Sequence, residues 1–167
     1  MTPANTTKWV GDFGENVVRG ILESRGYRAV ALQNASGQGI DVVAVKHKYG
    51  RSMLLVGEVK STGGVRAPSL STVQGKNLGE WARSRLVAVR EAAGRFRKMA
   101  PADRALAREI LELIDEGGIP AASVVVKVKG VGAGPPTVEF GGTTHVPRVG
   151  VTPSAVRRAR RRGRLRP

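Results

Sequence analysis

Cysteine is absent from this chain of 167 residues, and histidine occurs only twice. Without cysteine there can be no disulfide bond, no thiolate zinc site and no cysteine nucleophile, and two isolated histidines are too few for an all-histidine metal site. Aromatic residues make up 4% of the chain, too few for a surface that stacks nucleic-acid bases. Any bound metal would therefore have oxygen ligands.

Long apolar runs are also missing. No stretch approaches the ~18 apolar residues of a membrane span, and the first residues lack the charged start and apolar run of a secretory signal. We expect no membrane span, and either a cytoplasmic location or secretion by a route that needs no signal peptide.

Acidic residues are scarce relative to basic ones. The 13 Asp and Glu oppose 28 Lys and Arg, which gives a net charge of +15 and suits nucleic acid or an acidic protein as partner. Seven arginines lie in residues 156–167, so 15 − 7 = 8 positive charges remain on the preceding part. We predict that the tail, residues 154–167, is disordered and holds phosphates without sequence preference through Arg157, Arg158, Arg160, Arg161 and Arg162. The alternative is a solvated extension of little effect.

The remaining residues, 1–153, are expected to form one α/β domain, a mixed sheet flanked by helices. Its expected order is helix, three strands, two helices and a strand, followed by irregular chain from residue 130 onward. The first helix is expected to run from Asp12, as its cap, to about Arg25. The other expected elements are strands at 27–33, 40–47, 52–61 and 122–130, helices from Val73 into the nineties and from Pro101, and an edge strand at 137–140.

Charged residues stand at the ends of two of these apolar strands. If the second and third strands form a hairpin that turns at Tyr49 and Gly50, Asp41 lies opposite Glu58, and Lys60 shares their face. A slip of one residue would separate the two acids, and the sequence alone does not exclude it.

When two carboxylates lie close together in a half-buried site, each raises the pKa of the other unless a cation neutralises them. Oxygen ligands of this kind favour Mg²⁺ or Mn²⁺. Such an ion beside a lysine is suited to phosphodiester hydrolysis. Purely structural interpretations of these residues remain open. Asp41 could cap a strand end, and Glu58 could simply pair with Lys60. Asp12 and Glu15 have the spacing of a helix capping box.

The pattern of Asp41, sixteen intervening residues and Glu58-Val59-Lys60 resembles the PD-(D/E)XK nuclease superfamily. The resemblance covers residues 11 to about 95, from the helix with "GENVV" to the helix that opens with Gln74, and extends to the strand at 122–130. It implies a restriction-endonuclease-like core, a metal set of Asp41, Glu58, Val59 and Glu15, and further catalytic residues Lys60 and Gln74. The proline of the family signature is absent, because Gln38, Gly39 and Ile40 precede Asp41.

Residues 58–86 also resemble nuclease domains at the C-termini of bacterial polymorphic toxins, of the contact-dependent inhibition or RHS type. This implies a toxin or effector nuclease delivered into the cytoplasm of a target cell, and an acidic immunity protein as partner. We therefore expect a Mg²⁺- or Mn²⁺-dependent endonuclease acting on DNA or RNA, including tRNA, that holds its substrate with Arg66, Lys76 and the tail. The alternatives are a free-standing repair or recombination nuclease, a catalytically silent nucleic-acid-binding module, and a basic scaffold for an acidic protein.

Overall fold

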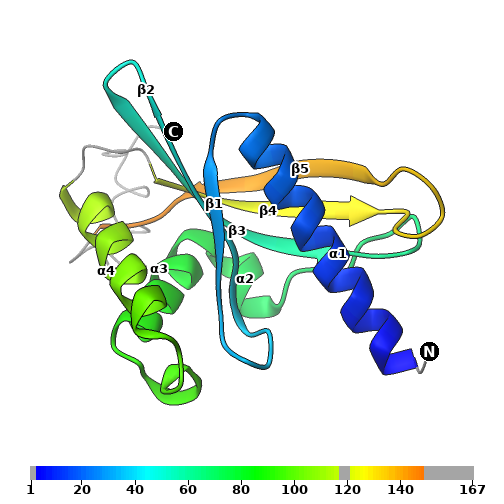
Figure 1. Cartoon of the computed structure of the whole chain (residues 1–167), viewed down its shortest axis with the longest axis horizontal. Helices are drawn as coiled ribbons and strands as arrows, with labels where there is room; N and C mark the ends of the chain where they lie inside the picture. The colour runs from blue at the N-terminus through cyan, green and yellow to red at the C-terminus, as the bar shows by residue number, and fades with distance from the viewer. Residues whose placement is uncertain (1–2, 117–120, 149–167) are drawn as a thin grey trace.

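A five-stranded mixed open sheet, in the strand order β1-β2-β3-β4-β5, forms the centre of an α/β fold flanked by helices (Figure 1). The computed structural model describes residues 3–116 and 121–148. The expected α/β class is confirmed, and the arrangement is compatible with a restriction-endonuclease-like core. In chain order the elements are α1 (Pro3–Ser24), β1 (Arg28–Gln33), β2 (Gly39–Lys48), β3 (Arg51–Ser61), α2 (Thr72–Lys76), α3 (Leu78–Arg90), the 3-10 turn η1 (Gly94–Phe96), α4 (Pro101–Glu116), β4 (Ala121–Lys129) and β5 (Thr137–His145).

The hairpin of β2 and β3 has the predicted register. Its antiparallel ladder runs from Lys48 opposite Arg51 to Val42 opposite Gly57. The turn residues Tyr49 and Gly50 both have positive φ angles, 52° and 69°, as a two-residue turn that matches the twist of the strands requires. The register therefore directs Asp41 and Glu58 to the same end of the hairpin.

The sheet is mixed because β4 lies parallel to β3, whereas the other neighbours are antiparallel. A parallel connection needs a crossover, and helices α2, α3 and α4 supply it. β5 confirms the edge strand expected at 137–140 but continues to His145, so the expectation of irregular chain there was wrong. The rest of β5 was not predicted because it lacks the regular alternation of side chains along a strand. The pairing shifts register beside Val125, and Gly142 has a positive φ angle of 66°.

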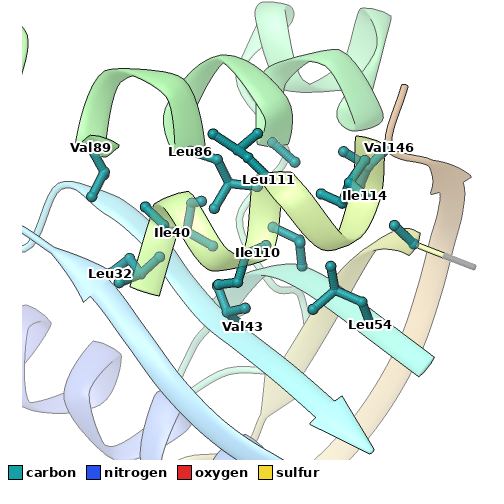
Figure 2. Packing of buried hydrophobic residues seen from close by; sticks show 14 of the residues in the cluster. Leu32, Ile40, Val43, Leu54, Leu86, Val89, Ile110, Leu111, Ile114 and Val146 are labelled. Atoms are coloured by element: carbon teal, nitrogen blue, oxygen red, sulfur yellow. The ribbon is translucent and has the colours of Figure 1, made fainter. Parts of the chain in front are cut away.

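Both faces of the sheet are covered, as the unbroken apolar runs of β2 and β3 suggested. On one face, α3 and α4 pack against the sheet (Figure 2), and the shared cluster includes Val43, Leu54, Leu86 and Ile110. On the other face, Val18 and Leu22 of α1 pack against a second cluster. Successive residues of β2 thus alternate between two cores.

Two helix boundaries differ from the prediction. α1 begins at Pro3, so Asp12 lies within the helix, where it is exposed and pairs with Lys8 at 2.7 Å. The expected cap at Asp12 and its capping box with Glu15 were therefore wrong. The sequence did not predict this first part of the helix, because the Asn and Thr residues at positions 5–7 favour turns as readily as helices.

The single helix expected from Val73 into the nineties is instead two helices. Asn77 adopts an extended conformation between α2 and α3 and accepts a hydrogen bond from the Glu80 backbone N–H, so it caps the start of α3. An asparagine that bonds the backbone in this way competes with continuous helix. Within the part of the chain that the structure describes, no helix has the length and apolar character needed to cross a bilayer.

Candidate active site

Asp41 lies in a β-bulge of β2, next to the point where the pairing of β2 with β3 ends. The β1–β2 ladder passes from Val30 opposite Val43 to Leu32 opposite Ile40, so one residue of β1 faces two of β2, and Asp41 is in this bulge. On the other side, the β2–β3 ladder stops at Val42. The bulge frees the Asp41 side chain to enter the gap between the strands.

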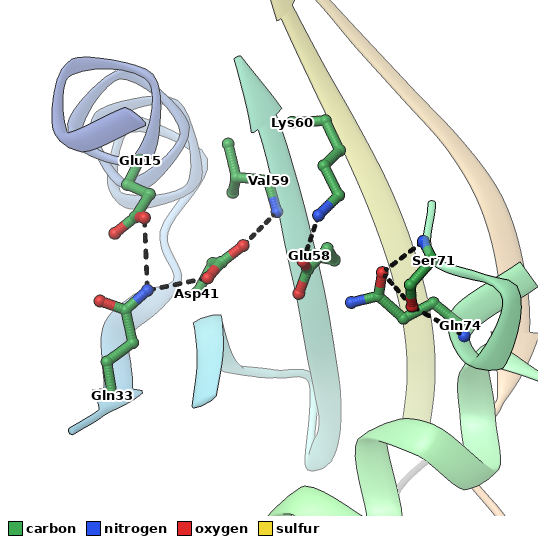
Figure 3. A network of polar contacts seen from close by, with 8 residues as sticks. All are labelled: Glu15, Gln33, Asp41, Glu58, Val59, Lys60, Ser71 and Gln74. Carbon is green, nitrogen blue, oxygen red and sulfur yellow. Dashed lines mark hydrogen bonds and ion pairs between the residues drawn. The ribbon is translucent and has the colours of Figure 1, made fainter. Parts of the chain in front are cut away.

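The Asp41 carboxylate fills this gap with two hydrogen bonds, as Figure 3 shows. The Val59 backbone N–H donates to Oδ2 at 2.7 Å, and the Gln33 side-chain amide donates to Oδ1 at 2.8 Å. The same Gln33 nitrogen donates to Oε1 of Glu15, at 3.3 Å. Gln33 therefore links the carboxylate of Glu15 on α1 to that of Asp41 on β2.

Glu58 and Lys60 form an ion pair on β3, with 2.6 Å between Lys60 Nζ and Glu58 Oε1. Their side chains are only 10% and 21% exposed. Both residues alternate in phase with Leu54 and Val56, which places them on the face that α3 and α4 cover further along. The predicted shared face of Glu58 and Lys60 is confirmed. Asp41 was expected directly opposite Glu58 on the same face, but it has no ladder partner on β3, and its carboxylate is bonded to Gln33 and to the Val59 N–H.

The electrostatics show that these acids are not fully neutralised. Burial and the charge of Glu58 together raise the pKa of Asp41 from 3.8 to about 7, although the Val59 hydrogen bond opposes the shift. Burial also raises the pKa of Glu15. Three carboxyl groups thus interact around one lysine that is hydrogen-bonded to only one of them. The site would bind an additional cation favourably.

Within residues 3–116 and 121–148, no group of three or more histidine, aspartate or glutamate side chains is arranged to hold a metal ion. The fit of Mg²⁺ therefore depends on Asp41 and Glu58. Mg²⁺ is commonly bound by one or two carboxylates together with water and substrate phosphate, so this donor set suits it. Val59 could contribute only its carbonyl oxygen, because its N–H is bonded to Asp41, and Glu15 reaches Asp41 through Gln33.

Gln74 is buried, with 6% of its surface exposed, although a glutamine in the first turn of a helix is usually solvated. Its side-chain oxygen accepts from the backbone N–H and the hydroxyl of Ser71, and the Ser71 hydroxyl accepts from the Gln74 backbone N–H, which forms a capping box for α2. Figure 3 shows its amide directed toward Glu58. Gln74 therefore has a structural role and also borders the site.

Gly14 allows α1 to approach β3 closely. A Cβ atom at this position would lie 1.7 Å from the Ser61 hydroxyl oxygen, so any larger residue would force the helix and strand apart. Glu15 follows directly, and its position depends on this contact. Gly14 and Gln33 were both missed as site residues. Gln33 is a polar residue at the end of an apolar strand, directly before a loop. This position is the sequence feature that could have identified Gln33 as a site residue.

A second lysine adjoins the site on the sheet. Lys127 of β4 lies opposite Lys60 in the parallel ladder and is exposed. Sequence reasoning overlooked it, because the pairing joins residues from distant parts of the chain. Arg66 and Lys76, which were expected to bind nucleic acid, are both exposed and follow β3 in the chain. The predicted arginines of the tail, 157–162, lie outside the described residues.

Comparisons of this chain with family models, curated proteins and solved structures found no match. The resemblance to PD-(D/E)XK nucleases therefore stays a prediction from the residue pattern.

Proposed function

We propose that this chain is a Mg²⁺-dependent endonuclease that hydrolyses phosphodiester bonds in DNA or RNA. The observation that carries the proposal is the bulge at Asp41, which brings a buried carboxyl with a pKa of about 7 beside the Glu58–Lys60 ion pair. Perturbed acids next to a lysine at the edge of a basic protein are typical of a reactive site for anionic substrates.

The roles follow from the contacts. A divalent ion held by Asp41 and Glu58 would polarise the phosphodiester and lower the pKa of a bound water. Gln33 and the Val59 N–H fix the orientation of the Asp41 carboxylate. Lys60, held by Glu58, supplies positive charge where negative charge develops on the phosphate oxygens.

The substrate strand would cross the cationic surface beside this site. Lys127 adjoins Lys60 on the sheet, and Arg66 and Lys76 are exposed on the segment that follows β3. Such contacts bind the phosphate backbone and do not read sequence. The proposal therefore includes binding with little sequence preference and does not distinguish DNA from RNA.

The test is cleavage of supercoiled plasmid and of purified tRNA by the purified protein with Mg²⁺ and with EDTA. We expect Mg²⁺-dependent cleavage that falls by roughly a hundredfold or more in Glu58→Gln, which removes the charge of a proposed metal ligand, and in Lys60→Ala, which removes the positive charge beside the reacting phosphate. Glu112→Gln and Lys98→Ala are matched controls, since both residues are exposed and lie on or near α4.

Equal cleavage by the wild type and Lys60→Ala would identify a contaminating nuclease and contradict the proposal. Salt-dependent binding of both nucleic acids without cleavage would instead support the silent binding module.

The role as a toxin or effector is a second part of the proposal, and its support is the resemblance of residues 58–86. It predicts that expression of the wild type inside bacterial cells arrests growth and that Glu58→Gln at the same protein level does not. Normal growth with an active enzyme in the cells would favour a free-standing nuclease.

A further inference from the structure

A pocket of about 660 Å³ lies on the α1 side of the sheet, beside the C-terminal end of that helix. Leu22 of α1 closes one side, and Leu55 and Val124 from β3 and β4 form part of its floor. Met53 and Phe140 also line it and are 51% and 37% exposed. In Figure 1 the β2–β3 hairpin extends past the end of α1, so the helix leaves this part of the sheet uncovered. The result is an apolar floor that faces solvent.

The rim of this pocket is positively charged. Arg25, Lys46 and Lys48 line it, and no acidic residue is among the described side chains that do. Two of these cations lie over aromatic rings: Lys46 Nζ is 5.3 Å from the centre of the Tyr27 ring, and Arg25 Cζ is 5.5 Å from that of Phe140. Lys46 also donates a hydrogen bond to the Arg25 carbonyl. These contacts hold the charges in place around the floor.

The pocket is separate from the candidate active site. Asp41 lies near the start of β2, whereas Lys46 and Lys48 lie near its end. Leu22 and Val124 belong to the core beneath α1, whereas Leu54 and Val56, in phase with Glu58 and Lys60, belong to the core beneath α3 and α4. Changes in the pocket can therefore be made without touching the residues proposed for hydrolysis.

We propose that this pocket docks an acidic amphipathic segment of a partner protein, with an aliphatic or aromatic side chain on the floor and carboxylates on Arg25, Lys46 and Lys48. An apolar floor that carries exposed Met53 and Phe140 and is ringed by positive charge is the arrangement of a protein interface anchor. Nucleic acid could pair its phosphates with the cations of the rim, but other phosphates would then lie over the apolar floor without a partner. The basic residues 156–167 and a second copy of this chain carry the wrong charge.

The probe is a fluorescent peptide of ~16 residues with leucines along one helical face and glutamates elsewhere, because such helices bind apolar grooves through one face. A peptide with the same residues in shuffled order and a single-stranded oligonucleotide are the comparison probes. We expect saturable binding of the first peptide by fluorescence anisotropy, weak binding of the shuffled one, and backbone amide shifts in NMR spectra at Met53, Val124 and Phe140.

The pocket double variant Lys46→Glu with Lys48→Glu should weaken peptide binding ~10-fold or more, because it reverses two charges on the rim. The control, Arg97→Glu with Lys98→Glu, makes the same charge change at exposed residues outside the lining and should have little effect. Phe140→Ala, at an exposed position on the edge strand, tests the apolar floor and serves if the double variant does not fold.

Three results would overturn the proposal. One is equal binding of the shuffled and amphipathic peptides, which would show that charge alone causes the binding and that the apolar floor does not contribute. Another is an equal loss of binding in the pocket and control variants. The third is oligonucleotide binding that shifts the same amides and displaces the peptide, which would assign the pocket to nucleic acid. None of these readouts depends on whether the chain cleaves a phosphodiester.

Discussion

Burial of the Asp41 carboxyl should make the metal-free protein less stable as the pH rises. The pKa of this group is about 7 in the folded chain and 3.8 without the fold's influence. Between these two values the folded state binds more protons than the unfolded state, so stability increases as the pH falls from 7 to 4. At about 1.4 kcal/mol per pKa unit, ionised Asp41 lowers the free energy of unfolding by about 4 kcal/mol above pH 7.

Asp41→Asn removes this penalty but weakens the hydrogen bonds from Gln33 and the Val59 N–H, a loss of about 2 kcal/mol in total. We therefore expect the variant to be more stable than the wild type by about 2 kcal/mol at pH 8 and less stable by a similar amount at pH 4. Urea unfolding followed by circular dichroism at pH 8, 6 and 4, in EDTA, measures the difference.

Glu112→Gln makes the same change from carboxyl to amide at an exposed position on α4 and is the control. A difference between Asp41→Asn and the wild type that stays constant from pH 8 to pH 4 would refute the reasoning, because it would mean that folding does not shift the pKa of Asp41. The same samples test metal binding without any cleavage assay. Mg²⁺ should raise the wild-type unfolding midpoint more at pH 8 than at pH 5, and should have little effect on Asp41→Asn.

Two further predictions concern the packing and the charge around the site. Gly14→Ala should lower the free energy of unfolding by about 1–3 kcal/mol in chemical denaturation and should also reduce cleavage, because the added methyl group displaces α1 from Ser61. Gly11→Ala is the control, because nothing lies within 4 Å of the added atom, and it should stabilise the helix by up to about 1 kcal/mol. If both changes destabilise the protein, the cause is strain within the helix, and the close contact with Ser61 does not explain the effect of Gly14→Ala. Lys127→Ala should weaken oligonucleotide binding and reduce the slope of log affinity against log salt by about 0.7–0.9, and an unchanged slope would show that Lys127 makes no phosphate contact.

The parts of the site that follow from local pattern could be predicted from sequence. A two-residue turn at Tyr49 and Gly50 predicts the register of the hairpin, whereas the unbroken apolar runs on either side do not exclude a slip of one residue. From this register the shared end of Asp41 and Glu58 follows. The alternation of residues along a strand likewise places Lys60 with Glu58.

The missed parts depend on contacts between distant segments. The bulge at Asp41 arises from how β1 pairs with β2, and neither strand shows it alone. Gln33 gains its role only when α1 brings Glu15 to the sheet, which in turn requires the small residue at position 14. Lys127 joins the site through a parallel pairing across three helices, and no local spacing predicts such a partner.

The parallel pairing of β3 with β4 has a consequence for synthesis of the chain. All the acids of the site, and Lys60, are made before residue 61, but the strand that completes the outer side of β3 begins only at Ala121. Until then a growing chain presents an apolar strand with unsatisfied backbone groups, a template for association with other chains. Ribosome-bound intermediates that end before β4 should therefore depend most on chaperones.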